Sequence, residues 1–149
     1  MQNYGIKIVF KAFNISTDFP SERNKNSMAG RILLVDQDHS CRNHLQVLLE
    51  KKGYQVVCLE DGYQVANILN DDSFDVIFLD SQTGGVRDKN LFPQIKRMSP
   101  GSHILLMTST CGNGFLKEAM EQGIYGCVTK PFKEDEILSF VHLLSPVKI

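Results

Sequence analysis

The sequence predicts an α/β fold in which helices cover both faces of a parallel sheet. Short apolar runs, rich in β-branched residues and too short for helices, alternate with segments of helical periodicity. Four of these runs end at a polar residue, namely Asp36, Asp80, Thr108 and Lys130. Because the carboxyl ends of parallel strands gather at one edge of such a sheet, we expect these four side chains to form one site.

The first two strand and helix units follow from apolar runs and helical spacing. Residues 31–35, which include the apolar run from Ile32 to Val35, predict the first strand. Leucines recur at helical spacing in residues 40–52 and predict the first helix, which Gly53 ends. Residues 55–59 predict a second strand and residues 61–69 a second helix. Two consecutive units of this kind indicate a right-handed crossover between parallel neighbours.

The third strand, residues 75–79, is the centre of the predicted sheet. It is apolar without alternation, which is typical of a strand buried on both faces. A flexible loop, residues 81–85, separates it from the next helix, which ends before a Ser-Pro-Gly turn. The remaining predicted elements are strands at residues 103–107 and 125–129 and helices at residues 89–98, 112–122 and 133–144.

Residues 1–29 differ from the rest of the chain and are expected to be an extension of a domain spanning residues 30–149. Residues 5–13 alternate loosely, as a strand would, whereas residues 16–30 are polar and contain Pro20. The extension is an extra edge strand, an arm that reaches a partner molecule, or a disordered leader; the sequence leaves all three open.

Composition excludes several classes of partner. The 149-residue chain has 16 basic and 17 acidic residues, so its formal charge of −1 gives no reason to expect direct binding of nucleic acid or of an anionic membrane. No apolar run approaches the roughly 20 residues of a membrane span, and no signal pattern starts the chain, which predicts a soluble cytoplasmic protein. The four cysteines are widely spaced, which predicts reduced thiols rather than a zinc site or a disulfide framework.

The expected site has the donors for a cation and a phosphoryl group. Asp36, Asp38 and Asp80 offer the carboxylate oxygens that Mg²⁺ prefers. Lys130 offers a positive charge and Thr108 a hydroxyl, both suited to phosphoryl oxygens. An aspartate can itself be the nucleophile and form an aspartyl phosphate.

Four segments carry a resemblance to a known family. They are Val35-Asp36-Gln37-Asp38, Val76-Ile77-Phe78-Leu79-Asp80, Leu106-Met107-Thr108-Ser109 and Thr129-Lys130-Pro131-Phe132. In order and spacing they resemble the receiver domains of two-component response regulators over about residues 31–144, with Lys-Pro-Phe as the most specific piece. The resemblance implies a flavodoxin-like fold, a doubly wound five-stranded parallel sheet of order 2-1-3-4-5.

The same resemblance implies roles for the site residues. Asp80 would be the phosphoacceptor, Thr108 the switch hydroxyl and Lys130 a phosphoryl contact, with a cis peptide bond between Lys130 and Pro131. Magnesium would be held by Asp36, Asp80 and the backbone of Gln82, with Gln37 or Asp38 as a further ligand. The implied partners are a sensor histidine kinase or phosphotransfer protein and an unidentified output protein. The module would not be an enzyme, and a homodimer is left open.

The chain departs from the family pattern at two site positions. Gln37 stands where the family usually has a second acid, so magnesium binding is expected to be weak. Cys127 stands where the family usually has an aromatic switch residue, which changes the expected signalling movement. Two alternatives therefore stay open: a phosphorylation-independent pseudo-receiver that acts as an interaction module, and a haloacid dehalogenase-like phosphatase using Asp36-Gln37-Asp38.

Overall fold

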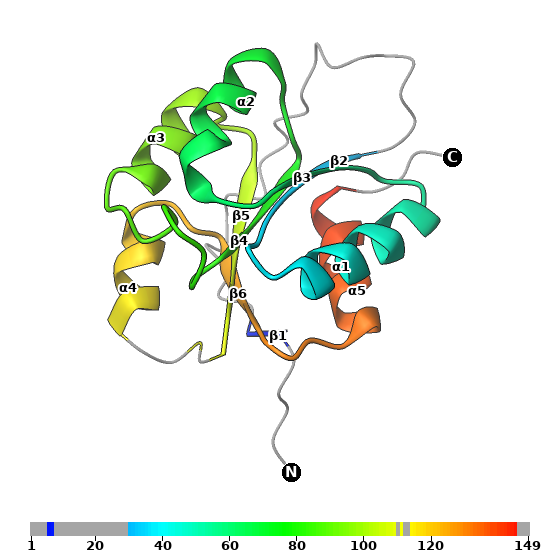
Figure 1. The fold of residues 1–149 in the computed structure, drawn as a ribbon. Helices are drawn as coiled ribbons and strands as arrows, with labels where there is room; N and C mark the ends of the chain where they lie inside the picture. The colour runs from blue at the N-terminus through cyan, green and yellow to red at the C-terminus, as the bar shows by residue number, and fades with distance from the viewer. Residues whose placement is uncertain (1–5, 8–29, 110, 112–113, 146–149) are drawn as a thin grey trace.

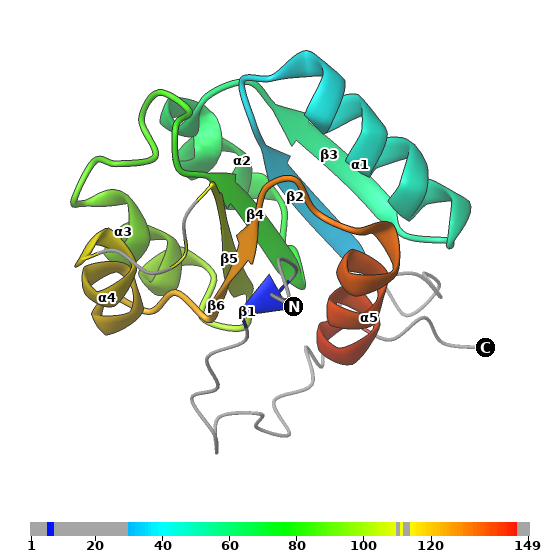
Figure 2. The same cartoon turned by 90° about the horizontal axis from the view of Figure 1, so that it is seen from below.

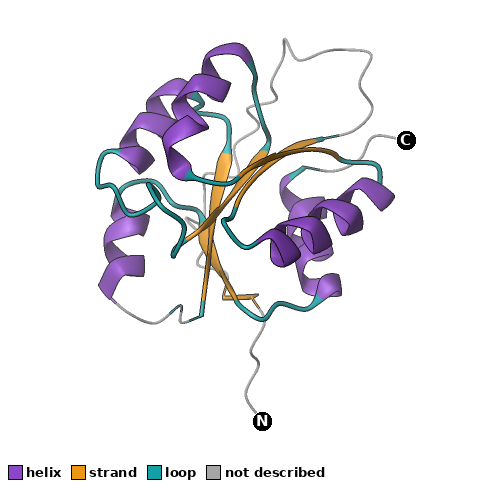
Figure 3. Ribbon diagram, viewed as in Figure 1, coloured by secondary structure: helices purple, strands orange, loops and turns teal. Residues whose placement is uncertain are grey.

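The computed structural model describes residues 6–7, 30–109, 111 and 114–145. In this part of the chain a twisted sheet lies between two layers of helices, with α1 and α5 on one face and α2, α3 and α4 on the other (Figures 1 and 3). The strands are β1 (Ile6–Lys7), β2 (Arg31–Val35), β3 (Gln55–Leu59), β4 (Val76–Asp80), β5 (His103–Thr108) and β6 (Gly126–Thr129). The helices are α1 (His39–Lys51), α2 (Val65–Asp71), α3 (Leu91–Met98), α4 (Gly114–Glu121) and α5 (Glu134–Leu144), with the short 3-10 helix η1 (Gly62–Gln64) before α2.

The sheet confirms the predicted topology and adds a strand to it. Five parallel strands lie in the order β3-β2-β4-β5-β6, which is the predicted order 2-1-3-4-5. The sixth strand, β1, pairs antiparallel with β6, the outermost of the parallel strands, with Ile6 opposite Val128 and Lys7 opposite Cys127 (Figure 2). Residues 6–7 thus form an extra edge strand, and the other residues of the extension lie outside the described part of the chain.

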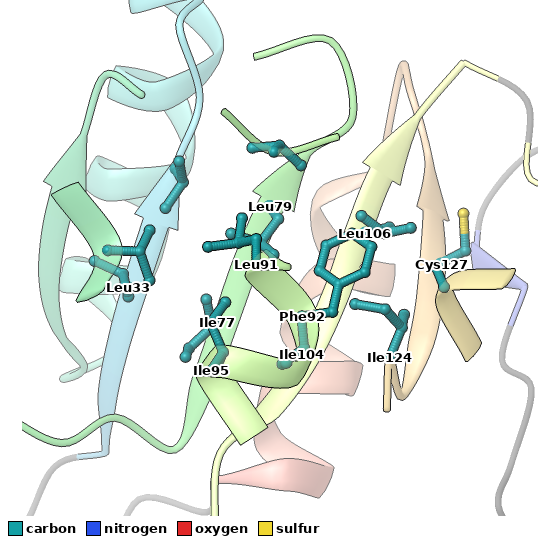
Figure 4. Close-up of a cluster of buried hydrophobic side chains, with 14 of the residues drawn as sticks. Leu33, Ile77, Leu79, Leu91, Phe92, Ile95, Ile104, Leu106, Ile124 and Cys127 are labelled. Carbon is teal, nitrogen blue, oxygen red and sulfur yellow. The ribbon is translucent and has the colours of Figure 1, made fainter. Parts of the chain in front are cut away.

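Side chains of the inner strands alternate between two apolar layers, because successive residues of a strand point to opposite faces. On β4, Val76 and Phe78 join the layer under α1 and α5, whereas Ile77 and Leu79 join the layer under α2, α3 and α4. Figure 4 shows the second layer, in which side chains of the inner strands face those of α3. All four side chains are 0% exposed, as the continuous apolar run predicted.

Aspartate side chains cap the first two helical segments, which begin within one residue of the predicted positions. Asp38 is the N-cap of α1, and its Oδ1 accepts hydrogen bonds from the backbone N–H groups of Ser40 and Cys41. Asp61 likewise accepts from the N–H of Tyr63 and starts η1. Capping of this kind satisfies backbone donors that have no partner inside the helix. Among the described residues no helix is both long and apolar enough to cross a bilayer.

The expectation of four reduced thiols is wrong for one pair of cysteines. Cys111 and Cys127 form a disulfide, with their Cα atoms 6.0 Å apart, while Cys41 and Cys58 are free. Cys111 follows β5 and Cys127 lies on the adjacent parallel strand β6, so the fold brings together two residues that are 16 positions apart. Linear spacing does not reveal such a pair, because Cys127 is opposite Leu106 in the register and Cys111 lies beyond the end of β5 at Thr108.

Candidate functional site

Two buried carboxylates and one ammonium meet at the carboxyl edge of the sheet. Asp36 follows β2 and Asp80 ends β4, and their side chains are only 1% and 6% exposed. The Nζ atom of Lys130 lies 2.7 Å from Asp36 Oδ2 and 2.9 Å from Asp80 Oδ1. Lys130 directly follows β6, so residues from three separate strands converge as the sequence suggested.

Thr108 lies at the same edge, at the end of β5. It is 6% exposed, and its carbonyl oxygen accepts a hydrogen bond of 2.8 Å from the backbone N–H of Lys130. In the sheet register Thr108 is opposite Thr129, and Asp80 is opposite Met107. The Lys130–Pro131 peptide bond is cis. The four predicted side chains therefore come from four neighbouring strand ends.

Thr83, which no sequence pattern singled out, contacts the predicted phosphoacceptor directly. Its Oγ1 donates a hydrogen bond of 2.7 Å to Asp80 Oδ2 and accepts one of 2.8 Å from the backbone N–H of Gln37. The side chain is 2% exposed. Both carboxylate oxygens of Asp80 are thus held, one by Lys130 and one by Thr83. The only advance signal was a hydroxyl in the loop after a strand that ends in aspartate.

The three residues that follow β2, namely Asp36, Gln37 and Asp38, differ in burial and in hydrogen-bond partners. Asp36 Oδ1 accepts a hydrogen bond of 2.9 Å from the N–H of Asp38, which holds the carboxylate toward the site. The carboxylate of Asp38 itself is exposed and caps α1. Gln37 is also exposed, and its backbone N–H reaches across to Thr83. The structure therefore brings Asp36 into the site and gives Asp38 a capping role.

Charge at the site favours a permanently protonated Lys130. Partial burial alone would lower the pKa of its ammonium, but the hydrogen bonds to Asp36 and Asp80 outweigh burial and raise the pKa above its ordinary value. Burial in the first turn of α1 raises the pKa of the neighbouring Cys41 thiol to about 12, with Lys130 lowering it and Asp36 raising it. Cys41 is therefore an uncharged thiol beside the site.

The site offers a hard cation few ligands, but their chemistry is suitable. Among the described residues no three His, Cys, Asp or Glu side chains gather as a metal cluster. Asp36 and Asp80 still provide two buried carboxylates, and Mg²⁺ commonly takes one or two carboxylates and keeps several waters. Lys130 already pairs with both carboxylates, so a cation entering here would share them with an ammonium.

A buried aspartate at the end of β4 and a lysine that follows β6 thus meet at the carboxyl edge of an open α/β sheet, although β5 lies between these two strands. The family profile of the response regulator receiver domain matches residues 32–142 of this chain. The chain therefore belongs to the response regulator receiver domain family. This agrees with the resemblance seen in the sequence.

Individual relatives are distant but cover most of the chain. Sporulation initiation phosphotransferase F of Bacillus subtilis (strain 168) is 27% identical over 121 residues, which are 81% of this chain and 98% of that protein. Transcriptional regulatory protein GlrR of Escherichia coli (strain K12) is 28% identical over 106 residues, which are 71% of this chain but only 24% of GlrR. The chain thus corresponds to about a quarter of the length of that regulator.

A solved structure supports the fold. The receiver domain of the sensor histidine kinase PA1611 from Pseudomonas aeruginosa PAO1, which has a magnesium ion coordinated in its active site cleft, superposes with a TM-score of 0.69. It is 21% identical, and the match covers 78% of this chain and 97% of that one. At this identity the similarity establishes the shared fold.

Proposed function

We propose that this receiver domain accepts a phosphoryl group on Asp80 from a phosphohistidine of a sensor histidine kinase or phosphotransfer protein. The observation that carries the proposal is the Asp80 carboxylate at the end of β4, with Lys130 Nζ 2.9 Å from its Oδ1. The domain acts as a signalling module rather than an enzyme, and it passes the signal to an output protein through its surface. The retained Lys130 and Thr108 support this proposal over the pseudo-receiver alternative.

The transfer follows from ordinary phosphoryl chemistry. A carboxylate oxygen of Asp80 attacks the phosphorus, a P–O bond forms, and the P–N bond of the donor phosphohistidine breaks as the imidazole leaves. The ammonium of Lys130 offsets negative charge on the phosphoryl oxygens, which is worth more in a partly buried site than in water. Thr108, at the end of the adjacent strand, supplies a hydroxyl for another phosphoryl oxygen.

Magnesium would be held by the carboxylates of Asp36 and Asp80 and by the backbone carbonyl of Gln82, with Gln37 as a neutral further ligand. When bound, the ion would neutralise phosphoryl oxygens alongside Lys130. The Asp38 N–H orients Asp36 through its Oδ1 atom, while Lys130 pairs with its Oδ2 atom.

The first prediction tests the nucleophile. Incubation of the full chain with acetyl phosphate and magnesium should add the mass of one phosphoryl group, and Asp80→Asn should abolish the addition because an amide cannot attack phosphorus as a carboxylate does. Intact-protein mass spectrometry measures both. The matched control is Asp88→Asn, an exposed aspartate in the loop before α3, which should label like the unchanged protein. Labelling that survives in Asp80→Asn would rule out this assignment.

The second prediction concerns the neutral residue beside the site. Gln37→Asp should tighten magnesium binding by about ten- to hundredfold, because a charged oxygen ligand replaces a neutral one. Labelling of Asp80 by acetyl phosphate should become faster in parallel. Magnesium titrations of the two proteins that superimpose would show that residue 37 is not a ligand position.

The third prediction concerns Thr83. Thr83→Val keeps the shape but removes the hydroxyl, which leaves a buried carboxylate oxygen and the Gln37 N–H without this partner. The free energy of unfolding should fall by about 2 kcal/mol. Urea denaturation measures the loss, and Thr83→Ser, which retains the hydroxyl, should recover most of it. A Thr83→Val variant as stable as the unchanged protein would mean that the hydroxyl does not contribute to stability.

The position of Asp38 argues against the phosphatase alternative. That reading needs both aspartates of Asp36-Gln37-Asp38 directed at one substrate, but Asp38 is exposed and caps α1 while Asp36 pairs with Lys130. The pseudo-receiver alternative predicts that acetyl phosphate leaves no label on the chain. The labelling experiment therefore separates it from the proposal.

A further inference from the structure

The disulfide between Cys111 and Cys127 has no part in the phosphoryl chemistry proposed above. It joins the segment that leaves β5 to the neighbouring strand β6, and the chain between the two cysteines contains α4. Figure 4 places Cys127 in the apolar layer that also contains Leu106, its partner in the sheet register. The bond therefore holds Cys111, which follows β5, against β6.

Short contacts connect this bond to the site. Cys111 Sγ lies 3.1 Å from Thr129 Oγ1, and Thr129 directly precedes Lys130. The N–H of Lys130 in turn donates to the carbonyl of Thr108. Cys111 is thus connected to Lys130 by one hydrogen bond and one peptide bond, and to Thr108 by one further hydrogen bond.

We propose that Cys111 and Cys127 form a reversible oxidative modification site, and that the oxidised pair restrains the segment after β5 and slows phosphoryl acceptance at Asp80. The co-reactant is a disulfide, either a small molecule or a protein. The effect on phosphoryl acceptance rests on the proposed function, whereas the reversible oxidation of the cysteine pair does not.

The reaction is two steps of thiol–disulfide exchange. The thiolate of Cys111 attacks one sulfur of the oxidant, the oxidant's S–S bond breaks, and one of its sulfurs leaves as a thiolate. The thiolate of Cys127 then attacks Cys111 Sγ in the mixed disulfide, so the intramolecular bond forms and the second oxidant thiolate leaves. Two electrons pass from the cysteine pair to the oxidant, and the two thiol protons end on its two sulfurs. Reduction by a dithiol reverses both steps.

Burial decides the order of attack within the pair. Cys127 is 0% exposed in the middle of β6, whereas Cys111 retains 6% exposure in a connecting segment. Cys111 is therefore the sulfur that an external thiol or disulfide meets, and Cys127 is the resolving sulfur.

The other two cysteines do not compete for the exchange. Cys41 and Cys58 pack against the opposite apolar layer, under α1 and α5. Burial raises the pKa of both thiols, so little thiolate forms at neutral pH. One cysteine pair is therefore available for the exchange. The other two thiols stay reduced in both redox forms and serve as a reference in the tag count.

We expect oxidation to affect the site by restraining the segment that follows β5. A phosphoryl group on Asp80 places new charge beside the end of β5, and the groups that contact it must adjust. Two unbonded sulfur atoms cannot approach as closely as bonded ones, so reduction releases Cys111 from β6. We therefore expect the reduced protein to accept the phosphoryl group more readily than the oxidised protein.

The modification itself is tested without phosphorylation. The full chain is equilibrated in glutathione buffers of graded redox ratio, quenched with acid, unfolded, and tagged with a maleimide for intact mass. The oxidised protein should carry two tags and the reduced protein four, in a single transition. Cys58→Ala should lower both counts by one and keep the transition, whereas Cys111→Ala should abolish it. A tag count of four in every buffer, or a transition that survives in Cys111→Ala, overturns the modification site.

The regulatory part is tested by labelling the two redox forms with acetyl phosphate. The reduced form should label about fivefold faster or more, the lower end of typical coupling between sites. Cys111→Ala and Cys127→Ala should each label at one rate in both buffers. Equal rates for the two forms of the unchanged protein overturn the coupling. Absence of label in both forms overturns the proposed function and the coupling with it, and the tag counts still decide the modification site.

Discussion

Lys130→Met should destabilise the domain by about 3 kcal/mol at pH 7.5, because it leaves two buried carboxylates facing one another without their cation. Asp36 and Asp80 are nearly fully buried, and each lies within 3 Å of the Lys130 ammonium. The expected loss is at the low end for a buried pair, because the Lys130 side chain keeps 23% exposure. Urea denaturation of the two proteins measures the difference.

The pH dependence of this loss distinguishes repulsion from lost packing. The raised pKa of Lys130 means that its contribution is complete below 10.5, the ordinary lysine value, and disappears only as the pH rises through the higher folded-state value. The loss in Lys130→Met should therefore stay constant up to pH 10.5 and shrink only above it, where the unchanged protein begins to lose the contribution of the ammonium. A loss that does not shrink above pH 10.5 would indicate packing of the lysine stem instead.

Two further variants complete this test. Lys133→Met removes a lysine that is 66% exposed and lies 4.0 Å from Glu136, so it should change the free energy of unfolding by less than about 0.5 kcal/mol. Asp36→Asn combined with Lys130→Met should recover most of the loss, because it removes one of the two facing charges. If Lys130→Met changes the free energy of unfolding as little as Lys133→Met does, the prediction is wrong. Water would then hydrate the two carboxylates well enough to replace the lysine.

The sequence predicted the parallel sheet well because apolar runs mark its inner strands. The run from Val76 to Leu79 is buried on both faces, so its strand was identifiable without any knowledge of its neighbours. The four strand-end residues converge because the topology places all parallel strand ends at one edge. A periodicity argument and a topology rule were therefore sufficient for the main features of the site.

Contacts that depend on loop conformation or strand register were not predictable in the same way. Thr83 reaches Asp80 because the loop after β4 turns back on the strand end, and Thr83 N–H donates to the Asp80 carbonyl in that turn. The Cys111–Cys127 pair depends both on the register, which places Cys127 opposite Leu106, and on where the chain goes after β5 ends at Thr108. Asp38 is a different case, since an aspartate just before a helix was a readable capping signal.

Phe78→Ala should lower the free energy of unfolding by about 3 to 5 kcal/mol, at least as much as Lys130→Met, because it removes a ring from the centre of a packed layer. Phe78 is 0% exposed on β4, between Leu34 of β2 and Leu105 of β5 in the sheet register. The layer above it is closed by α1 and α5, so the surrounding side chains can only partly collapse into the space. Domains of this size are typically stable by about 5 to 15 kcal/mol, so the variant should lie close to its unfolding threshold.

A graded series makes this prediction specific to the cavity. Phe78→Leu fills much of the space and should cost clearly less than the alanine variant, by the same argument from residual cavity volume. Tyr63→Ala removes an aromatic ring that is 73% exposed and should change the free energy of unfolding by less than about 0.5 kcal/mol. Urea denaturation should show lower midpoints for the Phe78 variants with an unchanged slope, because the surface exposed on unfolding stays nearly the same. Equal costs for Phe78→Leu and Phe78→Ala would contradict the packing argument, since only the alanine variant opens a large space between the sheet and the α1 and α5 layer.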